Sequence, residues 1–483
     1  MSDMKSTPLV EIAGLCDGAH IAVRKDLPEG LEVSGICHDS RLVREGDLFA
    51  CISGAVHDGH VYASDAMKQG AGALLVERHL DLDLPQLIVP NVREAVGYAA
   101  SAVYGYPSSK LKVVGITGTA GKTTVAHALA ETLEALGSSA GVLGTLEGNH
   151  TTPEAPDFQK ALSDMHDRGN EWACVEVSSH GLDYGRVEGT EFAAAVFTNL
   201  SAEHLDFHLD MESYFLAKRR LFEKTNGVAV VAVVDEWGER LANELQEERR
   251  QELVVVKPSM VESPVLDLAG SSFEWRGHKV NTPLLGLFNM FNLVVVAETL
   301  KGLGVGDEIV AHGLREVRPV KGRMEPLVVQ GSDISVVIDY SHKPESLAQA
   351  LKTVRTFSTG RVWVVFGAGG NRDSTKRPLM GQIASELADQ LIVTSDNPRF
   401  EEPSEIAEQI VGGIKIKPGR SKVILDRAEA IHSAINRAES GDSILIAGKG
   451  HESYQIIGSE RQPFDDLEVA KEALMVRVKA PLS

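Results

Sequence analysis

Short apolar runs alternate with amphipathic stretches along most of the chain. After residue 110, the segments KVVGIT, EWACVEV, AAAVFTNL and VAVVAVVD are typical of buried strands, and helical patterns separate them. The same alternation restarts after Pro319 in ISVVIDYS, RVWVVFGAGG, DQLIVTSDN and DSILIAGKG. Strands that alternate with helices favour mostly parallel sheets covered by helices, so we predict an α/β fold. Because ligands bind at the carboxyl ends of parallel strands, the last four loops are expected to share one cleft.

The chain is too long for a single hydrophobic core. Its 483 residues indicate several domains. The first hundred residues alternate short apolar runs with polar turns and end at the breaker-rich segment YGYPSSK, which is typical of a small α/β domain. We predict three domains, at residues 1–108, 109–318 and 319–483.

Composition limits the kinds of partner that the protein can bind. The formal net charge of −20 argues against nucleic acid and against stable association with anionic membranes, so an anionic ligand must be held by local cations. Four cysteines without a CxxC pair favour neither a zinc ribbon nor a disulfide framework. No secretion signal or membrane-spanning run is evident, and we expect a cytoplasmic monomer.

The segment GTAGKTT, residues 118–124, lies between a predicted strand and a predicted helix. Its glycines allow backbone N–H groups to face phosphate oxygens, Lys122 can bridge the β- and γ-phosphates, and Thr123 can reach Mg²⁺. The first glycine of the full phosphate-loop pattern is replaced by Ile116, so the loop is a shortened version. The alternative is a glycine-rich turn that only packs a strand against a helix.

Two further predicted strands lead into residues of types that commonly bind metal ions. Glu176 ends the strand EWACVEV, and His204 follows the strand AAAVFTNL. A carboxylate and an imidazole beside a phosphate loop could complete the coordination shell of a divalent ion. Taken singly, Glu176 could cap a helix and His204 could be an ordinary loop histidine, but their shared placement favours a metal site.

Ten motifs in a fixed order resemble those of the Mur ligase family. They are GTAGKTT, EVSSHGLDYGRV, TNLSAEHLDFH, YFLAKRRLF, GLFNMFN, GRMEP, DYSHKPESL, FGAGGNRDSTKRPLM, DNPR and GKGHE. The resemblance runs from about Asp39 into the last hundred residues and is strongest for the ligases that add the third amino acid to UDP-N-acetylmuramoyl-L-alanyl-D-glutamate. It implies an N-terminal UDP-binding domain, a central ATPase and a Rossmann-like C-terminal domain. It also implies that ATP phosphorylates a carboxylate, which an amine then attacks.

The resemblance implies roles for residues around ATP and Mg²⁺. Lys122, Glu176, His204 and Lys218 are expected to be catalytic, and Lys218 to be N6-carboxylysine; without the resemblance, residues 218–220 would be taken as a solvated basic helix face. Expected metal ligands are Thr123, Glu176, His204 and Lys218. The expected ATP-binding residues are Gly118, Thr119, Ala120, Gly121, Lys122, Thr123, Thr124, Asn289, Arg323, Asp339 and His342.

The resemblance also implies two substrate-binding sets. The UDP substrate is expected at the loop Gly54–His57 and at Ser40, Thr151, Thr152, Ser178, Tyr184 and Arg186. meso-Diaminopimelate is expected at Arg372, Asp396, Asn397, Pro398, Arg399, Gly448 and Glu452. Diaminopimelate differs from lysine by a second carboxylate, which suits the planar guanidinium of Arg399, while Glu452 suits its distal ammonium. For Arg399 the alternative is a surface arginine in a turn, and for the threonines a simple turn before Pro153.

Several positions depart from the family pattern. Ala120 and His150 stand where asparagine is usual, Tyr184 where glutamine is usual, and Ala202–Glu203 where an arginine–aspartate pair is usual. These departures keep open the alternative of a non-catalytic homologue that binds the UDP substrate. A lysine-adding ligase of the same family is the second alternative. A dinucleotide oxidoreductase is excluded because the third glycine of GxGxxG would fall at Arg372. A folylpolyglutamate-type ligase would not be expected to carry DNPR and GKGHE.

Overall fold

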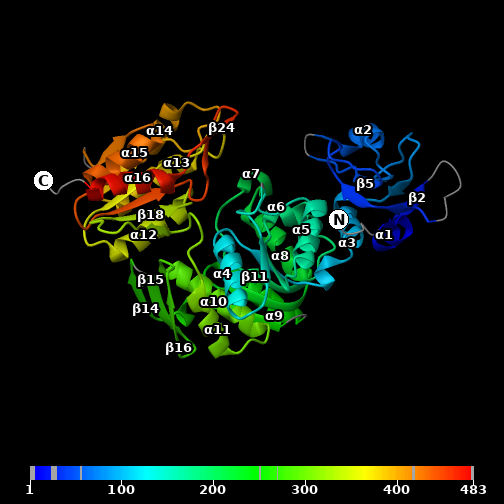
Figure 1. The fold of residues 1–483 in the computed structure, drawn as a ribbon, viewed down its shortest axis with the longest axis horizontal. Coiled ribbons are helices and arrows are strands. Elements are labelled where there is room, and N and C mark those ends of the chain that lie inside the picture. The colour runs from blue at the N-terminus through cyan, green and yellow to red at the C-terminus, as the bar shows by residue number, and fades with distance from the viewer. Residues whose placement is uncertain are drawn as a thin grey trace. The chain divides into compact units, whose positions relative to one another are not determined.

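The computed structural model describes residues 6–22, 30–54, 57–148, 150–249, 252–268, 270–415 and 419–479. The chain forms two compact units, one made of Met1–Pro258 and Val295–Gly306 and the other of Ser259–Val294 and Asp307–Ser483 (Figure 1). The three-domain division stays a prediction. Residues Ala55 and Val56 of the predicted UDP-binding loop lie outside the described residues.

The first unit begins with a five-stranded sheet of order β2-β7-β6-β5-β4. Its strands are β2 (His20–Ala22), β4 (Gly35–Cys37), β5 (Asp47–Ala50), β6 (Ala73–Val76) and β7 (Gln86–Ile88), and the pairs from β4 to β7 are parallel. A two-stranded pair joins β1 (Thr7–Pro8) to β3 (Glu32–Val33). The accompanying helices are α1 (Leu9–Leu15), η1 (Gly59–Tyr62), α2 (Ala63–Lys68), α3 (Val92–Val103) and η2 (Pro107–Ser109).

A six-stranded sheet of order β13-β12-β11-β8-β10-β9 follows in the same unit, and all its strand pairs are parallel. Its strands are β8 (Lys112–Thr117), β9 (Ala140–Leu143), β10 (Trp172–Glu176), β11 (Phe192–Phe197), β12 (Thr225–Ala232) and β13 (Glu252–Val256). Its helices are α4 (Lys122–Ala135), α5 (Ala155–Asp167), α6 (Ser179–Asp183), α7 (Leu205–His208), α8 (Met211–Glu223) and α9 (Glu236–Glu248). The order confirms the predicted parallel sheet and places the ends of β10 and β11 on either side of the end of β8.

The second unit begins with a small antiparallel sheet that strand–helix alternation does not predict. It consists of β14 (Glu262–Asp267), β15 (Gly270–Trp275) and β16 (His278–Thr282). The short helices η3 (Pro258–Met260), α11 (Asp307–Gly313) and η4 (Leu314–Glu316) flank this part of the chain. Helix α10 (Leu287–Gly302) starts in the second unit and continues into the first at Val295.

The larger sheet of the second unit has the order β17-β18-β22-β19-β20-β21. Only β17 (Glu325–Leu327) is antiparallel to its neighbour; the others are β18 (Ser335–Asp339), β19 (Val362–Phe366), β20 (Gln390–Val393), β21 (Ser421–Val423) and β22 (Ser443–Ala447). A hairpin of β23 (Tyr454–Ile457) and β24 (Glu460–Pro463) follows. The helices are α12 (Pro344–Phe357), α13 (Lys376–Leu387), α14 (Pro403–Val411), α15 (Arg427–Arg437) and α16 (Asp466–Lys479).

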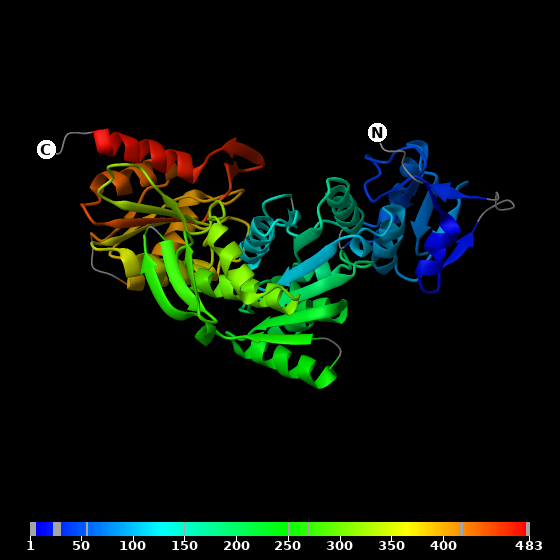
Figure 2. The ribbon, with the colours of Figure 1, turned by 60° about the horizontal axis from the view of Figure 1, so that its bottom comes forward.

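Helices cover both faces of this sheet, which explains why its central strands β18, β19, β20 and β22 are mostly apolar and buried. Val364 of β19 packs in a core with α12, α13 and α14, whereas Trp363 and Val365 pack in a second core with α15 and α16. Figure 2 shows α16, coloured red, running along one face of the sheet. None of the helices in the described parts of the chain is long and apolar enough to cross a membrane.

Candidate active site

The predicted phosphate loop connects β8 to α4 in a conformation that only glycine adopts easily. Gly118 has a φ of 148° and Gly121 a φ of 86°. A Cβ atom on Gly118 would lie 1.9 Å from Oγ1 of Thr198, so no other residue fits there without movement. Helix α4 begins at Lys122, directly after Gly121. The first backbone N–H groups of a helix point towards its start, a geometry that suits an anion at the end of β8.

Two lysine ammonium groups converge on this loop. Nζ of Lys122 and Nζ of Lys218 each donate to the carbonyl oxygen of Gly118, both at 2.8 Å. Lys218 is buried, and its ammonium lies 4.7 Å from the ring centroid of Tyr214. The alternative of a solvated basic helix face is therefore wrong for Lys218. Helix α8 places this side chain against the phosphate loop, although Lys218 and Gly118 are 100 residues apart in the sequence.

Glu176 and Thr123 form an oxygen pair beside the same loop. Oγ1 of Thr123 donates to Oε2 of Glu176 at 3.0 Å, and the backbone N–H of Thr145 donates to Oε1 at 2.9 Å. Glu176 is buried, and a Cβ atom on Gly144 would lie 2.3 Å from Oε1, so the backbone of residue 144 packs closely on the carboxylate. A carboxylate and a hydroxyl are ligands that Mg²⁺ prefers.

The donor set around Glu176 fits a magnesium ion that is shared with a nucleotide. Within the described ranges, no three His, Cys, Asp or Glu side chains are grouped so that they could hold a metal on their own. Mg²⁺ in nucleotide sites is usually bound by one or two carboxylates together with water and phosphate oxygens. Thr123 and Glu176 fit this chemistry, and the roles of Thr123, Glu176, His204 and Lys218 as metal ligands stay predictions.

His204 has left-handed backbone geometry, with a φ of 55°, at the start of α7. Its Nε2 lies 3.3 Å from Oε1 of Glu203, and its ring centroid lies 4.8 Å from that of His180 and 6.1 Å from that of Tyr214. The hydroxyl of Tyr214 lies 3.2 Å from Oγ1 of Thr119 in the phosphate loop. Tyr214 thus connects His204, Lys218 and the loop. Its position one helical turn before Lys218 in YFLAKRRLF was the signal that could have identified it.

The residues predicted to hold the peptide of the UDP substrate lie next to Glu176. Oγ1 of Thr152 lies 3.0 Å from the carbonyl oxygen of Glu176 and 3.1 Å from Oγ of Ser178. Oγ1 of Thr151 lies 3.0 Å from that of Thr145. Ser178 caps α6 by accepting the N–H of Gly181 at 3.0 Å. The structure therefore brings Thr151, Thr152 and Ser178 together at the end of β10.

Arg186 lies beside this group, but its donors are already engaged. Its Nε and Nη2 donate to Oε1 of Glu154 at 3.0 and 2.6 Å, and its Nη1 donates to the carbonyl oxygen of Thr152 at 3.0 Å. Tyr184 lies next to Arg186, with 5.5 Å between the guanidinium carbon and the ring centroid. Ser40 is half-buried at the end of the first sheet, three residues after β4.

In the second unit, the residues predicted to contact adenine, ribose or phosphate gather around Tyr340. The guanidinium of Arg323 lies 4.6 Å from the Tyr340 ring, and Nδ1 of His342 lies 2.9 Å from the Tyr340 carbonyl oxygen. Oδ2 of Asp339 accepts the N–H of Met324 at 2.8 Å, and burial raises the pKa of the Asp339 carboxyl. Asn289 is not in this group; it is buried and donates to the carbonyl oxygen of Leu285 at 2.8 Å.

The DNPR and GKGHE motifs meet through a buried polar group. Nδ2 of Asn397 donates to Oε2 of Glu452 at 2.8 Å. Nζ of Lys449, which is fully buried, donates to Oδ1 of Asn397 at 3.2 Å and to Oε2 of Glu452 at 3.1 Å. Gly448 has a φ of 118°, and a Cβ atom on it would lie 2.5 Å from Oδ2 of Asp396. Lys449 was missed in the sequence, although it is the lysine of GKGHE.

Arg399 also lies in this loop cluster. It has a φ of 54°, and its Nη1 donates to the carbonyl oxygen of Gly370 at 2.9 Å. A Cβ atom on Gly369 would lie 3.1 Å from Nη1 of Arg399 and 3.8 Å from Cγ of Arg372, which brings both predicted arginines to one glycine loop. Pro398 is buried beside them. The loops after β19, β20 and β22, three of the four that were expected to share one cleft, thus meet at one edge of the sheet; the shared cleft stays a prediction.

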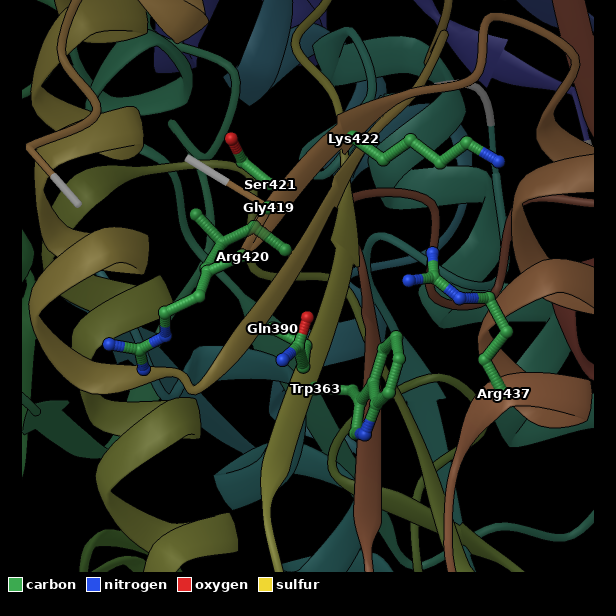
Figure 3. A pocket seen from close by; sticks show the side chains of 8 residues that line it. Trp363, Gln390, Gly419, Arg420, Ser421, Lys422 and Arg437 are labelled. Carbon is green, nitrogen blue, oxygen red and sulfur yellow. The ribbon is translucent and has the colours of Figure 1, made fainter. Parts of the chain in front are cut away.

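A pocket of about 270 Å³ lies at the other edge of this sheet (Figure 3). Trp363, Gln390 and Ser421, at the amino ends of β19, β20 and β21, line it together with Arg420 and Arg437. It contains none of the predicted site residues. Arg420 is already bonded to the carbonyl oxygen of Asp389 at 2.8 Å.

Three family models match consecutive parts of the chain. They are described as "Mur ligase family, catalytic domain" for residues 32–113, "Mur ligase middle domain" for residues 116–300 and "Mur ligase, glutamate ligase domain" for residues 322–450. Together these matches include every predicted site residue except Glu452, and they are consistent with the order of motifs in the sequence.

Named relatives match the chain over nearly its full length. The UDP-N-acetylmuramoyl-L-alanyl-D-glutamate–2,6-diaminopimelate ligases of Syntrophomonas wolfei and Gloeobacter violaceus are 39% and 41% identical to it, over 94% of this chain and 97% and 96% of theirs. A solved structure with the same ligase name is 31% identical, with a TM-score of 0.71 over 99% of this chain and all of that one. The MurF ligase of Thermotoga maritima, solved in complex with ADP, is 21% identical with a TM-score of 0.64 over 92% of this chain and 98% of its own, and it shares the fold.

Proposed function

The chain belongs to the Mur ligase family, and we propose that it joins meso-diaminopimelate to UDP-N-acetylmuramoyl-L-alanyl-D-glutamate in peptidoglycan synthesis, with conversion of ATP to ADP and phosphate. A carboxylate is a poor electrophile, so the terminal carboxylate of the dipeptide first takes the γ-phosphoryl group. The amine of diaminopimelate then attacks the acyl phosphate, the new amide bond forms and phosphate leaves. The four unpaired cysteines fit a cytoplasmic enzyme, which is part of the proposal.

The first unit supplies the groups for phosphoryl transfer. Catalysis of this step consists mainly of positioning and charge neutralisation. Lys122 and the N–H groups at the start of α4 hold the phosphates, and Thr123 and Glu176 would hold Mg²⁺, which neutralises negative charge on the phosphates when it is bound. Conversion of Lys218 to N6-carboxylysine would create an anionic metal ligand. The buried position of Lys218 against the phosphate loop would place that ligand beside the phosphates, which supports the predicted modification.

The arrangement of the DNPR and GKGHE motifs is the observation that favours diaminopimelate over lysine as the added amino acid. This amino acid has a carboxylate and an ammonium at each end, whereas lysine lacks the distal carboxylate. Arg399 lies in the loop after β20, and its guanidinium contacts the glycine loop after β19. Glu452 provides a carboxylate that Asn397 and Lys449 fix in place. A cation and an anion on adjoining loops match the distal end of diaminopimelate better than that of lysine.

The departure at Ala120 does not support the non-catalytic alternative. The amide of Asn199 binds the backbone of Ala120 on both sides, accepting its N–H at 2.9 Å and donating to its carbonyl oxygen at 2.9 Å. The loop is therefore held in its conformation without a side-chain amide at residue 120. The preorganised N–H groups and Lys122 remain, and these make most of the contacts to phosphate in such loops.

The amino-acid dependence of phosphate release tests the proposal. Purified protein is given UDP-N-acetylmuramoyl-L-alanyl-D-glutamate, ATP, Mg²⁺ and bicarbonate, with either meso-diaminopimelate or L-lysine. We expect rapid release of phosphate with diaminopimelate and little with lysine. The reverse preference would identify a lysine-adding ligase, and release with neither, together with binding of the UDP substrate, would identify a non-catalytic homologue.

A further inference from the structure

Arg93 occupies a position between the two halves of the predicted UDP-substrate site. It lies at the start of α3, where the Asn91 side chain caps the helix by accepting the Arg93 N–H at 2.9 Å. Its Nε donates to the carbonyl oxygen of Ser53 at 3.0 Å, directly before the predicted UDP-binding loop at Gly54–His57. Its guanidinium also lies 4.6 Å from the ring centroid of Tyr184, in the predicted peptide-binding half.

The Arg93 guanidinium has a donor that none of the described residues uses. Its Nη1 is buried and has no hydrogen-bond partner among the described residues. A buried polar group without a partner costs free energy, so such a group in a native protein calls for a ligand or another explanation. Arg186, which shares the Tyr184 ring with Arg93, differs because Glu154 and Thr152 use its donors.

The charge of Arg93 is also not neutralised by an acidic neighbour. In the parts of the chain that the structure describes, no carboxylate lies within ion-pair distance of its guanidinium. The nearby carboxylate of Glu77 accepts instead from the N–H of Val92 at 3.2 Å and from the Ser53 hydroxyl at 3.4 Å. On a chain with a net charge of −20, a cation in this state attracts an anion.

The covalent order of the substrate identifies that anion. In a UDP-sugar peptide, the diphosphate connects the uridine to the sugar, and the peptide follows the sugar. Arg93 bonds to Ser53 beside the predicted uridine-binding loop and contacts Tyr184 in the predicted peptide-binding half of the site. The anionic group of the substrate between these two halves is the diphosphate. Arginine suits this group because its planar fork donates two hydrogen bonds to phosphate oxygens.

We infer that Arg93 binds the diphosphate of the UDP substrate, with Tyr184 as the aromatic platform that holds its guanidinium. This inference rests on the proposed function. It also gives a role to Tyr184, whose ring lies 4.6 Å from the Arg93 guanidinium and replaces the glutamine side chain that is usual in the family.

The test compares two substrates in two variants. We use Arg93→Ala, and Arg168→Ala as a control because Arg168 is an exposed arginine at the end of α5 in the same unit and belongs to no predicted site. The substrates are UDP-N-acetylmuramoyl-L-alanyl-D-glutamate and the same molecule without UDP. With the UDP substrate, Arg93→Ala should lower kcat/KM about 30-fold, mainly through KM, as expected for loss of a buried charged contact. With the truncated substrate, which has no phosphate, Arg93→Ala and wild type should be equal.

Thermal protection gives a second readout that needs no turnover. UDP should raise the Tm of the wild type and of Arg168→Ala but not of Arg93→Ala, whereas ATP with Mg²⁺ should raise the Tm of all three. Equal losses with both substrates would overturn the inference, because Arg93 would then position the loops or contact the peptide. Unchanged UDP protection in Arg93→Ala would also overturn it. If the wild type releases no phosphate with the full substrate and UDP does not protect it, the proposed function itself fails.

Discussion

The role of Arg399 can be tested by a substitution that leaves the local backbone in place. In Arg399→Ala, the backbone N–H still donates to the Ile456 carbonyl oxygen at 3.0 Å, and the carbonyl still accepts the N–H of Gly458 at 2.7 Å. The φ of 54° is strained for any residue with a Cβ atom, so alanine adds no new backbone strain. The folded protein loses the hydrogen bond from Nη1 to the Gly370 carbonyl oxygen at 2.9 Å and a longer one from Nη1 to the Asn397 carbonyl oxygen at 3.5 Å.

These contacts set the expected magnitudes. Loss of these partly exposed hydrogen bonds should lower the free energy of unfolding by about 1–2 kcal/mol, which a domain of ordinary stability survives. Loss of the cation that binds a buried carboxylate costs about 2–5 kcal/mol, and each 1.4 kcal/mol is roughly a factor of ten. We therefore expect kcat/KM for meso-diaminopimelate to fall by a factor of about 30 or more. L-Lysine has no distal carboxylate for Arg399 to bind, so kcat/KM for L-lysine should stay the same.

The assay measures phosphate release over a range of each amino acid at saturating ATP and UDP substrate. The control is Arg437→Ala, because Arg437 is an exposed arginine in the pocket at the other edge of the same sheet. The control should behave as wild type with both amino acids. An equal loss for diaminopimelate and lysine in Arg399→Ala, or no loss for either, would refute the role of Arg399 in recognising the distal carboxylate.

Three further predictions concern other parts of the chain. Lys122→Ala should lower kcat by a factor of about 100 or more, because a positioned cation at a transferring phosphoryl group contributes several kcal/mol; a near-normal rate in the phosphate-release assay would contradict this. Lys449→Met should lower the Tm and raise the KM for diaminopimelate but not for ATP, since Glu452 loses a buried cationic partner; calorimetry and kinetics check both, and an equal rise for ATP would contradict it. The hydrogen bond from Arg477 lowers the pKa of Asp333, so this pair should stabilise the protein above a pH of about 4 and lose its effect as the pH falls through the lowered pKa of Asp333. Urea unfolding of wild type and Asp333→Asn should therefore differ by less than about 1 kcal/mol at neutral pH and converge in acid, and a gap that widens in acid would contradict the assignment.

The central strands of the parallel sheets could be predicted because they are buried on both faces. A strand such as β19 places Trp363 and Val365 in one core and Val364 in the other, so the whole strand is apolar and stands out in the sequence. Strand β14 shows the opposite case. It is mostly exposed, and Val265 keeps more than half of its surface in contact with solvent, so neither a buried run nor a clear alternation marks it.

The candidate site could be predicted only as far as its residues lie in local motifs. The phosphate loop, DNPR and GKGHE each place their functional residues within a few positions of one another. The contact between Lys449 and Asn397 joins residues 52 positions apart, and the hydrogen bond from Arg93 joins residues 40 positions apart. The sequence contains both partners in each case but no pattern that pairs them. The same limit applies to Arg186, whose pairing with Glu154 became visible only in the fold.

The pairing of Arg186 changes how the binding energy for the UDP substrate should be divided. A guanidinium that already bonds a carboxylate must give up part of that interaction before it can bind a substrate anion, so the exchange contributes little net affinity. Arg186 is in this state because of Glu154, whereas Nη1 of Arg93 has no hydrogen bond to give up within the part of the protein that the structure describes. Affinity should therefore come mainly from Arg93 and the diphosphate. Arg186 is better placed to hold Thr152 through its carbonyl oxygen, and thereby to fix the threonine that lies between Glu176 and Ser178.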